Sequence, residues 1–440
     1  MLLIKIAACS LLVVKRSERG KSKPRSYAIS ESLRAALYTS ASLSRVSQGI
    51  LGKSGVILPS VDRNLSLLFV INTIVAVYVN MSGTFVPLFI RGLGASVFQV
   101  SLVLFVGGTA ATAAMLPSGF LSDRYGRKGL MILSAAILFI SPLLYVFAET
   151  WEETIISTVI NMLAFSLFAP ARMTMIADQV GLSSLGRAYG LMNLAWPIGG
   201  IIGPFLGGFV ADNYGWTTFF FFLCALAFSC TVLTFFLSES MRRPKDEEER
   251  GTSKLFSREL ILVLAVFFLI HILGNAAGGI LGAVFPFYLT ENFNRSKTET
   301  GVFFSIGFGL ATLIAQLPSG LLADRLGRKK IMVYSVLLVP VLSFLFPFTG
   351  DYATTLLIYT ALSSLWSATW PASSAYLMDI SARSRRGLMM GVRLAAVRSG
   401  YTIGPLIGGF LWDAFDPAVS FYAATCLFVS SFLLILLLKE

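Results

Sequence analysis

The chain has 440 residues, of which 55% are hydrophobic and 13% are charged. Soluble domains carry about 25% charged residues, because polar groups must cover their surface. The composition therefore argues against a soluble enzyme and a disordered scaffold. The net charge of +12 does not indicate a nucleic-acid-binding protein either, because 11 of the 35 Lys and Arg fall in residues 1–63 and the others form short clusters between apolar runs. Such clusters orient membrane proteins.

Residues 1–63 are predicted to form a basic, disordered N-terminal tail. The tail begins with an apolar run, MLLIKIAACSLLVV, that is too short to span a membrane. Lys15 and Arg16 follow this run, which is the reverse of the order in a secretory signal peptide. Two alternatives to a plain tail stay open, namely an interfacial amphipathic segment and a start site that overextends the chain.

Twelve apolar segments follow, and each is long enough to cross a hydrocarbon core of about 30 Å as a helix. A backbone in lipid must form its hydrogen bonds internally, so all twelve are predicted to be helical. Eleven lack Asp, Glu, Lys and Arg, whereas the twelfth, 388–412, contains Arg393 and Arg398. Some loop is expected within 92–122 and 260–290. The twelve segments are 64–90, 92–122, 129–148, 154–171, 188–211, 213–238, 260–290, 300–323, 331–350, 352–378, 388–412 and 417–438.

The polar segment 239–259 is predicted to be a cytoplasmic linker between two six-helix bundles, 64–238 and 260–440. The loops on one side of the predicted membrane hold most of the Lys and Arg. Basic loops stay in the cytoplasm, so this side and both termini are predicted to be cytoplasmic in a multi-pass protein of the plasma membrane. The predicted fold class is an all-α membrane protein with 12 transmembrane helices in two pseudo-symmetric six-helix bundles.

An internal repeat relates the two predicted bundles at an offset of 201 residues. LPSGFLSDRYGRK at 116–128 returns as LPSGLLADRLGRK at 317–329. Other pairs at this offset are Asp178 and Asp379, Pro170 and Pro371, and Asp212 and Asp413. Two similar bundles in parallel topology predict a substrate site where they meet, near the midplane.

The repeated acidic and basic loop is predicted to act as a cytoplasmic gate. Gly126 and Gly327 permit a tight turn between helices. The forked guanidinium groups of Arg127 and Arg328 suit a second carboxylate, and aspartates lie at the ends of the fourth and tenth segments. Such a cluster can latch the bundles in one state and release them in another; a rigid loop with orienting charges is the alternative. The predicted gating residues are Gly119, Asp123, Arg124, Gly126, Arg127, Lys128, Asp178, Gly320, Asp324, Arg325, Gly327, Arg328, Lys329 and Asp379.

A glycine-rich motif on the fifth segment, repeated on the eleventh, predicts close helix packing. Gly199, Gly203 and Gly207 recur every four residues and so share one helix face, where small residues let another helix approach. This contact is predicted either to seal and break during transport or to serve packing alone. The motif residues are Gly190, Gly199, Gly203, Pro204, Gly207 and Gly208, with Gly391, Gly400, Gly404, Pro405, Gly408 and Gly409.

On these motifs, the chain resembles the major facilitator superfamily over roughly residues 64–438. The motif GFLSDRYGRK and its copy GLLADRLGRK carry the resemblance, which implies alternating access between two bundles. The glycine and proline motif of the fifth segment resembles that of drug–proton antiporters. Two features depart from those antiporters: Thr158 occupies the position of their fourth-helix arginine, and the first segment has no acidic residue.

The resemblance also implies that the first, fourth, seventh and tenth helices line a central cavity. Asn72 and His271 are predicted to face each other across it, and His271 is the candidate proton carrier because it titrates near neutrality. An interhelical hydrogen bond is the alternative role for His271, and core packing is the alternative for the tryptophans. Arg398 is predicted to draw in an anionic group or to pair with a carbonyl or headgroup, whereas Arg393 is predicted to snorkel. The predicted path residues are Asn72, Asn80, Asn161, His271, Asn275, Trp366, Trp370 and Arg398.

The function predicted from these features is secondary transport by a monomer in the lipid bilayer. The preferred substrates are small apolar or amphipathic organic compounds, exported by proton antiport. Because no P-loop is present, ATP-driven transport is not expected. We expect no enzyme activity, no cofactor, no metal site and no nucleic-acid partner. The alternatives are a facilitator or importer of a polar solute or organic anion, and a receptor or scaffold that does not transport.

Overall fold

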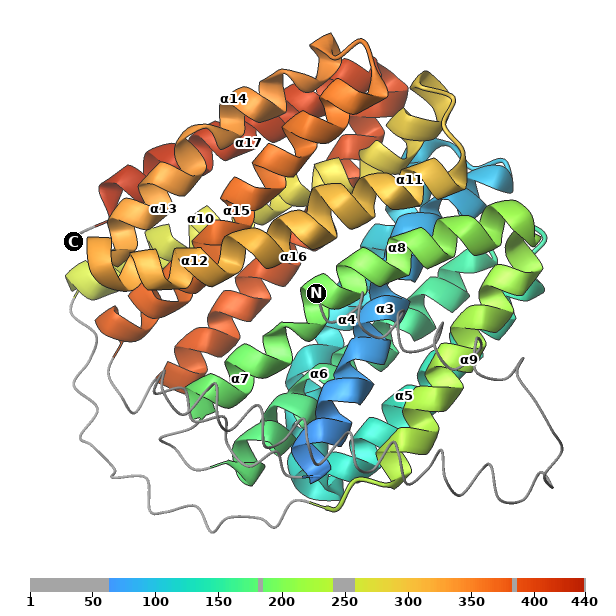
Figure 1. Cartoon of the computed structure of the whole chain (residues 1–440), viewed down its shortest axis with the longest axis horizontal. Coiled ribbons are helices and arrows are strands. Elements are labelled where there is room, and N and C mark those ends of the chain that lie inside the picture. Colours follow the sequence, from blue (N-terminus) through green and yellow to red (C-terminus); the bar gives the residue numbers. More distant parts are fainter. Residues whose placement is uncertain (1–62, 181–184, 240–257, 382–385, 439–440) are drawn as a thin grey trace, which may run out of the picture. The chain divides into compact units, whose positions relative to one another are not determined.

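The computed structural model describes residues 63–180, 185–239, 258–381 and 386–438, and every regular element in them is a helix (Figure 1). The predicted tail, 1–63, lies outside the described residues except for Arg63, and the predicted linker, 239–259, lies mostly outside them. Within the described residues the fold is the predicted all-helical membrane fold.

The first half contains six crossings, of which the fifth is divided by a break at Leu194. Its helices are α3 (Arg63–Gly92), α4 (Val97–Tyr125), α5 (Arg127–Val146), α6 (Thr154–Gln179), α7 (Leu185–Asn193), α8 (Ala195–Asn213) and α9 (Gly215–Phe235).

The second half also contains six crossings, and its helices are more often interrupted. They are α10 (Arg258–Phe287) with the π-helix η1 (Tyr288–Asn292), α11 (Lys297–Phe304) with η2 (Ser305–Leu310) and α12 (Ala311–Leu326), α13 (Arg328–Leu337) with α14 (Val339–Phe344) and η3 (Phe346–Phe348), α15 (Tyr352–Ile380), α16 (Arg386–Ala414) and α17 (Pro417–Leu437).

Nine helices of the described residues are long and apolar enough to cross a membrane by length and composition. The other crossings are less apolar or less continuous. The crossing of α13 and α14 is broken at Leu338, two residues before Pro340, which has no N–H to donate. Ser, Thr, Tyr and Trp make α15 more polar, and α16 contains buried arginine.

Two helices extend beyond what the uncharged segments suggest. The uncharged fourth segment ends at residue 171, whereas α6 continues to Gln179 and so contains Arg172. The expected loop within 260–290 does not exist, because α10 and η1 are helical throughout this range. The loop expected within 92–122 is present at residues 93–96. A charged side chain thus does not end a helix when neighbouring helices supply it with buried partners.

Short connections alternate between two ends of the helices. We call the end that carries Gly126 and Gly327 the loop end. We call the end that carries residues 93–96 and 415–416 the opposite end.

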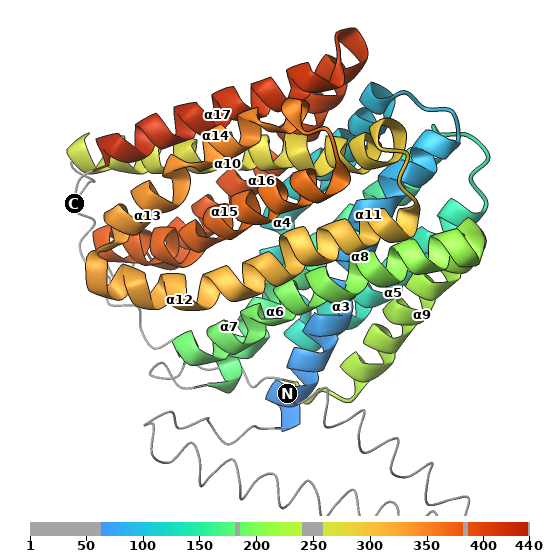
Figure 2. The same ribbon diagram turned by 45° about the horizontal axis from the view of Figure 1, so that its top comes forward.

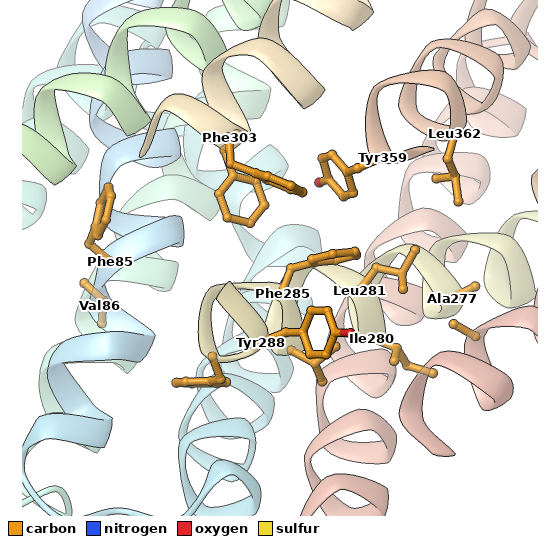
Figure 3. Packing of buried hydrophobic residues seen from close by; sticks show 14 of the residues in the cluster. Phe85, Val86, Ala277, Ile280, Leu281, Phe285, Tyr288, Phe303, Tyr359 and Leu362 are labelled. Carbon is orange, nitrogen blue, oxygen red and sulfur yellow. The ribbon is translucent and has the colours of Figure 1, made fainter. Parts of the chain in front are cut away.

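The two halves contact each other through α8 with α11 and η2, and through α4 with α16. Figure 2 shows α8 and α11 side by side. Aromatic side chains fill much of the second half near the opposite end. The ring of Phe285 lies 4.7 Å from that of Phe346 and 4.8 Å from that of Tyr359, and Phe303 also points toward it (Figure 3). Such edge-on contacts stabilise the core beyond the area that they bury.

Candidate functional site

The loop end carries an arginine–aspartate ion pair in each half. Arg127 Nε lies 3.2 Å from Asp178 Oδ2, and Arg328 Nε lies 3.2 Å from Asp379 Oδ2. Arg328 also pairs with Asp324 at 2.8 Å. The structure therefore brings together the predicted partners. Each of these pairs joins helices of the same half, so none of them latches one half to the other in this conformation.

The turns of the two loops need glycine. Gly126 has φ +87° and Gly327 has φ +101°, a left-handed region that disfavours side chains. Gly119 and the side chain of Asp123 lie outside the described part of α4. Of the remaining predicted gating residues, Arg124 lies 5.6 Å from the ring of Tyr125.

Glu239, at the loop end, was not among the residues predicted from the sequence. Its Oε1 accepts hydrogen bonds from the backbone N–H groups of Arg127 at 3.1 Å and Lys128 at 3.3 Å. A carboxylate at the start of α5 is favoured by the helix dipole. The Lys128 ammonium donates to the carbonyl of Phe235 at 2.8 Å. The first residue of the predicted linker thus fixes the start of the third crossing.

The four-residue glycine face of α8 packs inside its own half. A Cβ at Gly199 would lie 2.5 Å from the carbonyl carbon of Ala76, and one at Gly203 would lie 2.6 Å from the carbonyl oxygen of Val77. Gly400 has the same relation to α10, at 2.5 Å from the carbonyl oxygen of Ile272. The predicted close approach is present, and its partners are the first and seventh crossings.

Other glycines of the motif lie at the boundary between the halves. A Cβ at Gly208 would lie 2.8 Å from the carbonyl carbon of Lys297, and one at Gly409 would lie 2.6 Å from Cβ of Ser101. The first glycine of each motif was wrongly assigned to packing. At Gly190 and Gly391, an added Cβ would meet no atom within 4 Å.

Repeated aspartates join the two halves at the opposite end. Asp212, at the end of α8, accepts hydrogen bonds from the backbone N–H groups of Lys297 at 3.2 Å and Thr298 at 2.6 Å. Asp413, at the end of α16, accepts from the N–H of Phe98 at 2.8 Å. Each carboxylate thus caps the first turn of a helix in the other half. The sequence repeat related these two residues but assigned them no role.

Ion pairs also join the halves at this end, and Lys297 Nζ lies 3.6 Å from Asp212 Oδ1. Arg91 Nε is 2.8 Å from Glu291 Oε1, and both side chains are 37% exposed. An exposed pair of this kind contributes about 0–1 kcal/mol, so this ion pair alone does not hold the opposite end closed.

Asn72 and His271 do not face each other as expected. The Asn72 side chain donates to the carbonyl of Met192 at 2.7 Å and accepts from Arg172, both within the first half. His271 Nε2 accepts from Arg393 Nε at 3.3 Å within the second half. Both side chains are buried, and partners on neighbouring helices of the same half satisfy them.

Arg393 does not snorkel. Only 3% of it is exposed, and its Nη2 donates to Ser373 Oγ at 3.0 Å. Its guanidinium lies 5.1 Å from the ring centre of Trp370, a favourable cation–π distance. The hydrogen bonds to His271 and Ser373 hold it inside the second half.

Four other predicted path residues have partners within their own half. Asn80 donates to the carbonyl of Ala76 at 2.8 Å, and Asn275 donates to that of His271 at 2.7 Å. Asn161 donates to Tyr78 Oη at 2.6 Å. The Trp366 ring lies 5.2 Å from that of Phe428 and packs on Gly274.

Arg398 has a different environment, because it contacts the first half. Its guanidinium lies 4.7 Å from the ring centre of Phe165 on α6. Gly400, two residues later on α16, packs instead on α10. Arg172, on the same helix as Phe165, was assigned no role from the sequence, because it follows directly after the uncharged stretch 154–171.

The described residues contain no group of three or more His, Cys, Asp or Glu that is placed to hold a metal ion. The polar sites formed by these residues are hydrogen-bonded guanidinium, amide and imidazole groups on facing helices. Such groups can bind and orient a solute, and arginine suits planar acidic groups in particular.

Two six-crossing halves with a repeated acidic and basic loop define a membrane transport protein. The profile of the Major Facilitator Superfamily matches residues 68–278 and, in a second match, residues 267–440. The chain therefore belongs to this superfamily of secondary transporters, which bind small molecules in membranes.

Curated relatives with similar sequences include multidrug resistance proteins. The chain is 27% identical over 308 residues to multidrug resistance protein 1 of Bacillus subtilis, which covers 69% of this chain and 77% of the relative. It is also 27% identical over 351 residues to multidrug resistance protein MdtG of Proteus mirabilis. This match covers 77% of this chain and 86% of the relative.

Solved structures of the same fold include two transporters. A D-xylose–proton symporter superposes with a TM-score of 0.70 at 16% identity, covering 84% of this chain and 97% of that one. A mutant of the nucleoside transporter NupG superposes with a TM-score of 0.69 at 15% identity, covering 86% of this chain and 100% of that one. At these identities the likeness concerns the fold alone.

Proposed function

We propose that this transporter exports small amphipathic organic compounds across the plasma membrane by alternating access. Relatives at 27% identity that are multidrug resistance proteins support this direction and substrate range. The boundaries proposed for the two moving bodies are 64–238 and 260–440, with 239–259 as their linker. The loop end is proposed to be cytoplasmic, because it carries most of the Lys and Arg of the connecting segments.

The observation that carries the proposal is the pair of aspartate caps at the opposite end. Asp212 and Asp413 each bind the first turn of a helix in the other half. Charge at a helix N-terminus contributes about 0.3–1 kcal/mol when exposed. Two such contacts favour closure without making it permanent. A transporter needs a seal of this kind, which can break when the loop end closes.

The loop-end pairs complete the proposed cycle. Arg127 with Asp178 and Arg328 with Asp379 each stabilise one half, and in the other state the loops meet across the boundary. A receptor or scaffold that does not transport would need neither a reversible seal nor two copies of the loop.

Protons are the proposed coupling ion, with His271 as the proposed carrier. In this conformation its Nε2 accepts from Arg393, so a proton can bind there only when that hydrogen bond breaks. Proton binding is thereby linked to a rearrangement of α16 against α10.

Transport in vesicles of defined orientation tests this function. Purified protein in liposomes should expel amphipathic dyes through the side that corresponds to the opposite end. An imposed pH gradient should accelerate the expulsion. Dye movement equal to that of protein-free liposomes, with and without the gradient, would contradict the proposed function. Gradient-independent movement in both directions would identify a facilitator instead.

A further inference from the structure

Three arginines lie inside the membrane-spanning helices. Arg172 and Arg393 each lie seven residues from the loop end of their helix, and Arg398 lies five residues deeper. At 1.5 Å per residue these depths are about 10 Å and 18 Å. In contrast, every Asp and Glu in the described helices lies in the first or last turn. The interior of the transporter is therefore cationic.

The arginine of the first half is held by neutral groups. Arg172 Nη1 donates to the side-chain oxygen of Asn72, whose amide in turn donates to the carbonyl of Met192. The Nε of Arg172 is buried and has no hydrogen-bond partner among the described residues. A guanidinium is always charged and can only donate. Arg172 thus retains an unused donor and an uncompensated charge.

The second half repeats this arrangement with its arginine on another helix. Arg393 donates to His271 Nε2 and to Ser373 Oγ, which are also neutral acceptors. At the offset of 201 residues, Ser373 corresponds to Arg172, and Arg393 corresponds to Met192. Each half therefore holds one guanidinium where its first, fourth and fifth crossings meet. Since Arg172 lies on the fourth crossing of its half and Arg393 on the fifth crossing of its own, the sequence repeat alone does not reveal that the two arginines are equivalent.

Arg398 brings a third cation to the boundary between the halves. Its guanidinium lies over the ring of Phe165, and Phe165 precedes Arg172 by seven residues on α6. Residues seven apart share one helix face. The face of α6 that carries Arg172 thus also meets a cation from the second half.

A buried charge without a counter-ion is costly in a membrane. The described helices carry no Asp or Glu at this depth, and none of these three arginines forms an ion pair with the described residues. A ligand with an acidic group would supply the missing negative charge. Arginine binds planar carboxylates and tetrahedral oxyanions with paired hydrogen bonds, while Phe165 and Trp370 offer ring faces beside the cations.

We propose that the boundary between α6 and α16 binds an organic anion, namely a ring-bearing compound with a carboxylate or sulfonate group. Arg172 and Arg398 hold the acidic group, and the ring of Phe165 beside Arg398 holds the apolar part. This substrate class rests on the proposed transport function and narrows it from amphipathic compounds in general to amphipathic anions.

Three probes with the same ring and different charge test the proposal. 2-Naphthalenesulfonate, 2-naphthalenemethanol and 2-naphthylmethylammonium are titrated into the purified full-length protein by calorimetry. The sulfonate should bind at least about tenfold more tightly than the alcohol, since charge-assisted hydrogen bonds add to the same ring contacts. The ammonium compound should bind more weakly than the alcohol. Equal affinity for all three, or preference for the ammonium compound, would overturn the proposal.

Matched variants locate the preference. Arg398→Gln and Arg172→Gln should each reduce the sulfonate affinity about tenfold and leave the alcohol affinity unchanged. Arg398→Lys should keep most of the preference. Lys330→Gln is the control, because it removes an exposed cation on α13. If Lys330→Gln and Arg398→Gln lost the same amount of sulfonate affinity, the preference for the sulfonate would come from net charge, and the proposed site would be overturned. If a variant does not fold, the ranking of the three probes by the native protein still decides.

Transport of the same probes separates this proposal from the proposed function. Tight sulfonate binding that depends on Arg398, without movement across liposomes, would support the anion site and reject the transport function. Movement of all three probes at equal rates and affinities would support the function and reject the anion site.

Discussion

The two ends of the transporter use repeated aspartates in different ways. At the loop end, Asp178 and Asp379 bind arginines of their own half. At the opposite end, Asp212 and Asp413 bind backbone amides of the other half. The same residue type therefore stabilises a single half at one end and joins the halves at the other. This difference assigns the closed contact of this conformation to the opposite end.

The largest expected effect on transport comes from a glycine that packs between the halves, compared with a glycine that packs within one half. Gly208→Leu places a side chain against the backbone of Lys297 and Thr298 in the other half. We expect folded protein that cannot close its opposite end, with transport reduced more than about tenfold. The matched change, Gly199→Leu, meets the backbone of Ala76 in the same half. It should reduce the yield of folded protein, because overpacking costs about 1–3 kcal/mol.

Size-exclusion profiles and liposome transport measure both outcomes. Normal transport by Gly208→Leu would show that the contact of α8 with α11 need not re-form during the cycle.

The next effect, on proton coupling, distinguishes the buried arginine site of the second half from that of the first half. His271 in the second half can bind a proton, whereas Asn72 in the first half cannot. His271→Gln keeps a hydrogen-bonding side chain beside Arg393 but removes proton binding. We expect gradient-driven transport to be lost and substrate exchange to survive. A full response of this variant to an imposed pH gradient would leave His271 as a hydrogen-bond partner only.

A smaller effect distinguishes the two loop-end aspartates. The Asp178 side chain is 14% exposed, whereas that of Asp379 is 60% exposed. Solvent screens the exposed pair, so its contribution is about 0–1 kcal/mol. Asp178→Asn should therefore lower the transport rate several-fold more than Asp379→Asn. Equal rates for the two variants would show that burial does not set the strength of these pairs.

The smallest single effects are expected at the aspartate caps. Asp212→Asn and Asp413→Asn should each shift the equilibrium toward an open opposite end by a few-fold, since each cap contributes about 0.3–1 kcal/mol. The double variant should show a larger shift. Reaction of a cysteine introduced at Phe98 with a water-soluble maleimide, in a cysteine-free background, measures this opening. A reaction rate unchanged in the double variant would contradict the role of the caps.

Most of the fold could be predicted from the sequence, because lipid forces each long apolar run into a helix. The pairing of Arg127 with Asp178 and of Arg328 with Asp379 could also be expected from the repeat. The contacts between halves were harder to predict. Nothing in the sequence indicates that Asp212 meets the first turn of α11, because this contact depends on the conformation of the transporter.

The predictions failed mainly for buried arginines. Arg172 lies directly after the uncharged fourth segment and was assigned no role, and Arg393 was expected to snorkel, because charge is costly in lipid. The structure instead gives each one neutral partners inside its half. Only side-chain geometry reveals such partners, since they come from helices far apart in the sequence.

The central claim is that one end of the transporter opens while the other closes. One distance across each end tests this claim directly. Spin labels at Tyr214 and Phe415 report on the opposite end, and labels at Tyr125 and Leu326 report on the loop end; all four side chains are exposed. The cysteine-free protein in liposomes is measured with and without a pH gradient, and with Asp212→Asn and Asp413→Asn combined. We predict that the first distance lengthens while the second shortens under each change. Two distances that stay constant, or that lengthen together, would contradict alternating access through these contacts.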